Sequence, residues 1–226
     1  MNNRITVRGE LALATTVIIN SMGVLLMLKS GSGISAISSV PYAFSLVLPQ
    51  LSLGTWTYIF QSLMILSLMV LRRRFVPEYL FSFVVGFLFG KAVDLHSAWI
   101  SLLPVNLPLR FAYFTAGYII ISFGIAISNR CKLPIIPTDL FPRELSDIIS
   151  KPYSVIKITF DVVCLTITGS MTFFFLGKVM GLGIGTILAA FTTGKAVALI
   201  GNALDKHVDF VSCLSEHKRK LGEAKV

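Results

Sequence analysis

Six long apolar runs constrain the fold of this chain more than any other feature of its sequence. A helix needs about 20 largely apolar residues to cross a bilayer, and each run is close to that length. The runs are Leu11–Leu28, Thr55–Leu71, Tyr79–Ile100, Phe111–Ile127, Tyr153–Leu176 and Val179–Leu204. Of the 226 residues, 54% are hydrophobic and only 14% are charged, which is more apolar surface than a soluble domain can bury. The sequence therefore predicts an all-α integral membrane protein with six transmembrane helices.

The basic residues predict how these helices are oriented. The net charge is +9, and most Lys and Arg residues lie beside the apolar runs, as expected for anchors at the anionic cytoplasmic face. This placement argues against nucleic acid as the partner. Arg8, the Arg72–Arg74 triplet, the 130–151 connection and the basic tail at 207–226 all fall on one side if the N-terminus is cytoplasmic. We therefore expect both termini in the cytoplasm.

The connections after the first and fourth runs are too long and too apolar for simple loops. Each holds a Ser or Asp, Ser38 or Asp139, followed three residues later by Pro41 or Pro142. A side chain that accepts N–H bonds, followed by an early proline, is typical of a helix start. We expect a short broken or re-entrant helix in each connection, with Ser38 and Asp139 as caps. Alternatively, Asp139 marks a helix N-terminus that faces a ligand.

Matching residues suggest that the chain contains two copies of one unit. Gly90-Lys91-Ala92-Val93 recurs as Gly194-Lys195-Ala196-Val197. Three earlier pairs share one constant offset, namely Gly23 with Gly124, Ser38 with Asp139, and Pro41 with Pro142. The sequence thus predicts two three-helix repeats, residues 8–104 and 109–206. Because three is an odd number of spans, the second copy must be inverted relative to the first, as in many transporters.

Three motifs resemble those of the YczE/YitT-type family of bacterial polytopic inner-membrane proteins. They are Gly31-Ser32-Gly33, Pro137-Thr138-Asp139-Leu140, and the Gly181-Leu182-Gly183-Ile184-Gly185-Thr186 stretch that enters the last run. The resemblance covers about residues 10–200. It implies a multi-pass protein of the bacterial inner membrane, in a family mostly without an assigned activity. Ser38 stands where that family often has an aspartate, and Lys91 and Lys195 where it usually has uncharged residues.

Two charged residues four positions apart, Lys157 and Asp161, share one face of the fifth predicted helix. Charged side chains within a span are costly and usually face cavities, pathways or partners. One interpretation is a substrate-binding or coupling pair. The other is that Lys157 extends to the cytoplasmic headgroups while Asp161 neutralises it.

Lys91 and Lys195 occupy equivalent positions in the two copies. Two equivalent cations could hold an anionic substrate, or each lysine could reach its own membrane interface, with Asp94 neutralising Lys91. Lys195 has no acidic residue within its own apolar run. An unpaired lysine there would lose its proton or draw in water. We therefore expect its amine to reach either Asp161 or a hydrated central cavity.

These observations predict a small secondary transporter or channel-like permease with a site between the repeats. The candidate substrate-binding residues are Lys195, Asp161, Lys91, Asp139, Ser38 and Lys157. The expected partners are the bilayer and a small solute, and the lysine pair favours an anionic one. The alternative is a non-transporting scaffold or accessory protein for another membrane complex. No nucleophile–base motif, metal-ligand spacing or phosphate loop is present in the sequence, so we expect no enzyme activity, cofactor or metal. The sequence does not fix the oligomeric state.

Overall fold

The computed structural model describes residues 5–73, 76–131, 133 and 135–212, which form eight helices and two four-residue strands. Six of these helices are long and apolar enough to cross a membrane, which confirms the predicted helical, multi-pass membrane protein. The six are α1 (Gly9–Ser30), α3 (Leu53–Arg72), α4 (Glu78–Ile100), α5 (Leu107–Ser128), α7 (Tyr153–Leu176) and α8 (Ile184–His207).

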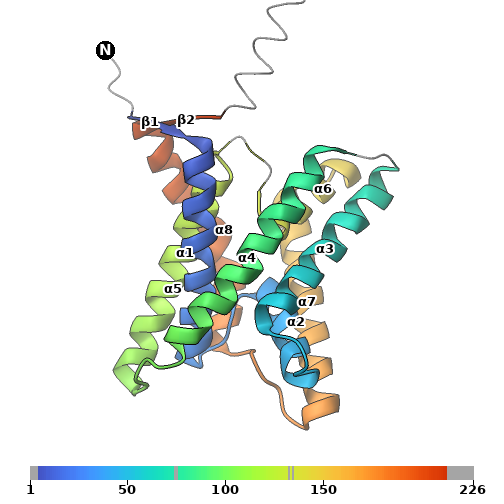
Figure 1. Cartoon of the computed structure of the whole chain (residues 1–226), viewed down its shortest axis with the longest axis vertical. Helices are drawn as coiled ribbons and strands as arrows, with labels where there is room; N and C mark the ends of the chain where they lie inside the picture. The colour runs from blue at the N-terminus through green and yellow to red at the C-terminus, as the bar shows by residue number, and fades with distance from the viewer. Residues whose placement is uncertain (1–4, 74–75, 132, 134, 213–226) are drawn as a thin grey trace, which may run out of the picture.

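The two shorter helices lie in the two long connections, as the sequence predicted. They are α2 (Ala36–Val47) and α6 (Pro137–Ile149). The chain therefore runs twice through the order long helix, short helix, long helix, long helix (Figure 1). In Figure 1, α2 lies in the lower part of the molecule and α6 in the upper part.

The short helices begin three residues earlier than the sequence suggested, so the expectation that Ser38 and Asp139 cap them was wrong. The N-cap residues are Ser35 and Ile136, which puts Ser38 and Asp139 at the third helical position. The misleading signal has a physical cause, since an acidic or hydroxyl side chain is favourable throughout the first turn. In α6 the first helical position is instead occupied by Pro137, a residue that favours this position.

Two short strands, which the sequence did not predict, join the ends of the described chain. β1 (Ile5–Arg8) pairs in parallel with β2 (Val208–Val211). This pair lies at one end of the molecule, next to the start of α1 and the end of α8 (Figure 1). We call it the strand end. The tail beyond residue 212, assigned above to a cytoplasmic basic segment, lies outside the described residues.

The most extensive helix contact is between α1 and α5, which cross at Gly23 and Gly117. A Cβ atom added to Gly23 would lie 3.0 Å from the Gly117 carbonyl oxygen, and one added to Gly117 would lie 2.7 Å from the Gly23 oxygen. Small residues let two helices approach closely enough for backbone contact, as is common in membrane proteins. This crossing, together with α4, forms the main buried core, which includes Met27, Val93 and Ile121.

Candidate functional site

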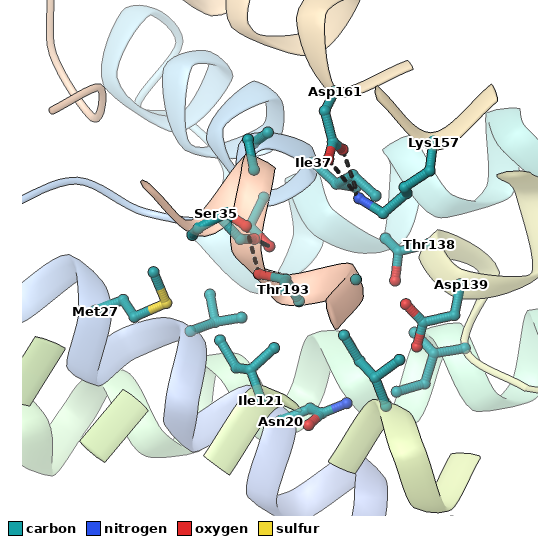
Figure 2. Close-up of a pocket in the computed structure, with 18 of the residues that line it drawn as sticks. Asn20, Met27, Ser35, Ile37, Ile121, Thr138, Asp139, Lys157, Asp161 and Thr193 are labelled. Atoms are coloured by element: carbon teal, nitrogen blue, oxygen red, sulfur yellow. Dashed lines mark hydrogen bonds and ion pairs between the residues drawn. The ribbon is translucent and has the colours of Figure 1, made fainter. Parts of the chain in front are cut away.

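A cavity of about 340 Å³ lies between the helices, and all eight helices contribute to its wall. Its size falls within the range of small-molecule sites. One part of the wall is apolar, with side chains such as Val24, Phe60 and Phe89. The polar part carries Gln61, together with Asn20, Asp139, Lys157 and Asp161, which are labelled in Figure 2. A mostly apolar cavity with a few convergent polar groups is the usual form of a ligand site.

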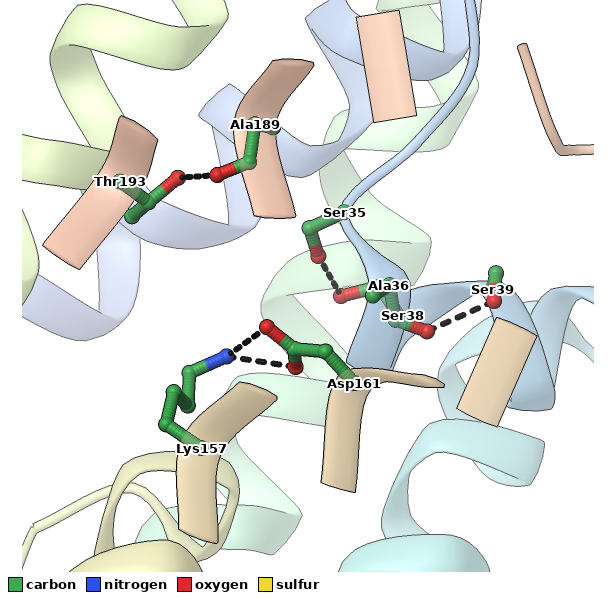
Figure 3. Close-up of polar contacts among 8 residues, drawn as sticks. All are labelled: Ser35, Ala36, Ser38, Ser39, Lys157, Asp161, Ala189 and Thr193. Carbon is green, nitrogen blue, oxygen red and sulfur yellow. Dashed lines mark hydrogen bonds and ion pairs between the residues drawn. The ribbon is translucent and has the colours of Figure 1, made fainter. Parts of the chain in front are cut away.

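The most deeply buried polar pair in this wall consists of Asp161 and Lys157, both on α7. The Lys157 Nζ donates to Asp161 Oδ1 at 2.6 Å and to Oδ2 at 2.7 Å (Figure 3). The Asp161 side chain is only 5% exposed. The predicted pairing of these residues is therefore present, and both side chains line the cavity. Because the lysine donates to both carboxylate oxygens, the two charges neutralise each other and the pair has no net charge.

Asp139 lies near this pair but has no partner of its own. Its carboxylate is directed into the cavity, as Figure 2 shows. Among the described residues no hydrogen bond or ion pair engages it. Burial is the main cause that raises the pKa of Asp139 to about 6; Lys157 and Arg143 oppose this rise and the Asp161 charge adds to it. The cavity therefore holds a carboxylate that is easily protonated.

The remaining candidates from the sequence are divided between the cavity wall and the exterior. Ser38 and Lys195 both line the cavity, and the Ser38 hydroxyl accepts from that of Ser35 at 2.9 Å. Lys91 does not line the cavity. Its ammonium lies 5.6 Å from the centre of the Phe87 ring, and Asp94 instead accepts hydrogen bonds from Ser52 and the Gly54 N–H at the start of α3. The structure thus brings five of the six candidates together and leaves Lys91 outside.

Among the cavity residues that were not proposed from the sequence are two with side-chain amides, Asn20 and Gln61. Gln61 is 1% exposed, and neither its Oε1 nor its Nε2 has a hydrogen-bond partner among the described residues. Asn20 is 4% exposed, and its Oδ1 is likewise unpartnered. A side-chain amide inside an apolar run is itself a signal, because polar groups inside a membrane are expensive and tend to be functional. Both residues could have been found on that ground.

The unpartnered amide of Gln61 leads to a prediction about stability. Gln61→Leu is expected to raise the free energy of unfolding by about 1–2 kcal/mol, because it removes a buried polar group that has no partner. Equilibrium unfolding in mixed micelles measures this change. The exposed residue Gln50 supplies the matched control, since Gln50→Leu should alter stability by less than about 0.5 kcal/mol. A destabilised Gln61→Leu protein would mean that the amide is satisfied.

The unpartnered carboxylate of Asp139 leads to a second prediction. Its folded-state pKa of about 6 is above the ordinary value of 3.8, so its contribution favours folding at low pH and is lost as pH rises through about 6. Relative to wild type, Asp139→Asn should be more stable at pH 7.5 by about 1–2 kcal/mol. The difference should vanish near pH 4. Unfolding curves at the two pH values test this, and a difference that does not change with pH would contradict it.

Comparison with known proteins identifies the family of the chain. No curated protein and no solved structure matches it. A family model does match, over residues 7–202, and it describes a family of unknown function, DUF6198. This match covers all eight helices except the last residues of α8. The chain therefore belongs to the DUF6198 family.

Proposed function

We propose that the protein is a small secondary transporter or channel-like permease, with the cavity as its solute site. The observation that carries the proposal is the polar part of the cavity wall. An unpaired carboxylate at Asp139 and unpartnered amides at Asn20 and Gln61 meet inside a bundle of membrane-length helices. Buried polar groups without partners lower stability. A protein that served only as a scaffold would gain from an apolar centre.

The second part of the proposal is that residues 8–104 and 109–206 are inverted repeats. Helix contacts support it, because most recur when the two halves are exchanged. α1 packs on α4 as α5 packs on α8, and α2 packs on α3 as α6 packs on α7. Across the halves, α2 packs on α7 as α6 packs on α3, and α1 packs on its own counterpart α5.

Individual residues support the same two-fold relation. The constant offset that pairs Gly23 with Gly124 also pairs Thr16 with Gly117. The contact between Gly23 and Gly117 should then have a counterpart between Gly124 and Thr16. Thr16 Oγ1 indeed lies 3.4 Å from the Gly124 carbonyl oxygen, to which it donates. A two-fold axis near the crossing of α1 and α5 accounts for both contacts.

The symmetry fails at one helix pair, and this failure suggests how the site could open. α3 and α4 pack closely, and a Cβ atom added to Gly90 would lie 2.5 Å from the Gly54 oxygen. Their counterparts, α7 and α8, make few contacts, and a Cβ atom added to Gly194 would meet no atom outside its own helix within 4 Å. Gly194 instead lines the cavity. Inverted repeats in unlike conformations are the basis of alternating access, so closing α7 onto α8 while α3 leaves α4 would expose the site to the other side.

The proposal includes location and orientation. It places the protein in the bacterial cell membrane with the strand end, and so both termini, in the cytoplasm. The basic residues Arg8, Arg72 and Arg130, which lie at the ends of α1, α3 and α5, support this orientation through the positive-inside rule. The resemblance to YczE/YitT-type proteins belongs to the same proposal.

Accessibility from the two sides of a membrane tests the proposal. The native cysteines are first replaced by serine, and Ser38→Cys is introduced into the cavity wall. The protein is reconstituted in one orientation in unilamellar vesicles and exposed to a membrane-impermeant maleimide from the inside or from the outside. A permease must present its site to both sides over time, so labelling from either side is expected.

A control variant and the pattern of labelling distinguish a permease from a non-transporting accessory protein. Ser67→Cys is the matched control, because Ser67 is exposed near the end of α3 and does not line the cavity. It should not react with equal ease from both sides. If Ser38→Cys is labelled from one side only, or from neither, the permease proposal fails. The alternative of a non-transporting accessory protein would then stand.

A further inference from the structure

We propose that the cavity takes a small organic cation, an amine with an apolar body, whose positive charge rests against the Asp139 carboxylate. This inference rests on the proposed function, since it names the class of solute that the same site would carry. It departs from the anionic solute suggested by the lysine pair. The reason is the way in which the charges of the cavity are distributed in the structure.

Lys157, one of the two cations that act on Asp139, is not free to receive an anion. Lys157 already contacts both oxygens of Asp161, at 2.6 and 2.7 Å, so the attraction it offers to another anion is largely neutralised. Lys91, the second member of the lysine pair, lies outside the cavity wall. The anionic interpretation required two equivalent lysines facing one site, and only Lys195 lines it.

The carboxylate, by contrast, is available. Asp139 is directed into the cavity, as Figure 2 shows, with no hydrogen bond or ion pair among the described residues. An ionised carboxylate accepts hydrogen bonds but cannot donate them, so its natural ligand is a cationic donor. Hydrogen bonds of this charge-assisted kind are roughly twice as strong as neutral ones. The unpaired carboxylate therefore favours an ammonium or guanidinium group at this position.

The rest of the wall indicates the body of the ligand. Aromatic and aliphatic side chains line the cavity around this polar region, among them Val24, Phe60, Phe89 and Ile121. Binding to such a wall is favourable because it removes apolar ligand surface from water. Aromatic faces also attract cations. An aryl or alkyl amine fits this combination, whereas a small inorganic cation would leave the apolar wall unused.

A proton and an organic cation cannot occupy the same carboxylate, and this gives the inference a second readout. The charged and titratable groups that act on Asp139 are Lys157, Arg143 and Asp161, and Tyr153 lies nearby on α7. Because burial raises the pKa of Asp139 to about 6, near that pH a cation that binds must displace a proton. At pH 8 the carboxylate is already ionised and no proton should be released.

Three probes of nearly equal size test the inference on the purified full chain. Benzylamine is cationic, benzyl alcohol is neutral and benzoate is anionic. Ligands that bind only the folded state raise its stability by mass action, so thermal unfolding over a concentration series gives a Kd for each. We expect the benzylamine Kd to be at least about tenfold lower than the other two. In weak buffer near pH 6, benzylamine should also release protons.

Matched variants show whether Asp139 is responsible. Asp139→Asn should raise the benzylamine Kd about tenfold and abolish proton release. Asp147→Asn removes the same charge from the same helix at an exposed position outside the cavity wall, and it should change neither. The comparison of the three probes on the wild-type protein keeps the test decisive even if Asp139→Asn is poorly expressed.

Three results would overturn the inference. Tighter binding of benzoate, lost in Lys195→Met, would make the site anionic, and the permease proposal would survive with a different solute. Equal stabilisation by all three probes would assign binding to apolar contact alone. Absence of any binding would also overturn it. In each case the maleimide experiment tests the permease proposal independently, because it requires no ligand.

Discussion

Lys157→Met is expected to lower the free energy of unfolding by about 3–5 kcal/mol, the usual cost of removing one partner from a buried ion pair. The lysine holds both oxygens of Asp161, and that carboxylate is 5% exposed. Without the lysine, the carboxylate must remain charged in an apolar environment or take up a proton. Equilibrium unfolding in mixed micelles measures the loss.

The double variant separates a lost partner from lost packing. Lys157→Met combined with Asp161→Leu should recover most of the stability, because both charges are then absent. The exposed Lys151, just before α7, is the matched control, and Lys151→Met should change stability by less than about 0.5 kcal/mol. If the double variant is no more stable than the single one, the ion pair is not the source of the effect.

Lys195→Met decides between the two partners expected for that lysine from the sequence. Asp161 is already engaged by Lys157, and Lys195 lies on the cavity wall. Its replacement should therefore leave the free energy of unfolding nearly unchanged. A loss as large as that in Lys157→Met would instead assign Lys195 to Asp161.

Hydropathy predicted the helices well because it reports the length of chain that can lie in a bilayer. The fifth predicted run, Tyr153–Leu176, coincides with α7, and the third differs from α4 by one residue. The last run was placed too early, at Val179, because Val179, Met180 and Leu182 make the turn before the helix as apolar as the helix itself. Gly181 has a positive φ of 77° and belongs to the turn before α8.

The site was less predictable, because the sequence reports charge but not which charges meet. The pairing of Lys157 with Asp161 follows from their spacing of four on one helix. The separation of Lys91 from Lys195 does not, since the two lysines recur in the same motif. This difference depends on how closely the preceding long helix packs against the helix that carries each lysine: α3 packs closely on α4, whereas α7 makes few contacts with α8. Gln61 and Asn20 carry no formal charge, so the pattern of charged residues does not single them out.

Gly90→Leu is expected to lower the free energy of unfolding by about 3 kcal/mol or more. A Cβ atom there would lie 2.5 Å from the Gly54 carbonyl oxygen, and a helix backbone has little freedom to move away. Overpacking of this kind commonly costs 1–3 kcal/mol, and more when the backbone is the obstacle. Equilibrium unfolding in mixed micelles measures the change.

Gly194→Leu is the natural control, because Gly90 and Gly194 open the same four-residue motif in the two halves of the chain. No atom outside the same helix lies within 4 Å of a Cβ atom added there, so the substitution should be neutral or stabilise by up to about 1 kcal/mol through helix propensity. Equal destabilisation by the two substitutions would contradict the difference in packing between α3–α4 and α7–α8.

The same pair of variants connects this asymmetry with movement. If α7 closes onto α8 as α3 now packs on α4, Gly194 must accept a close neighbour in the closed state, just as Gly90 does here. A leucine at Gly194 would leave the present conformation stable while blocking the other one. In the Ser38→Cys background, Gly194→Leu should therefore keep maleimide labelling from one side and lose it from the other. Labelling that persists from both sides would show that α7 and α8 do not close in this way.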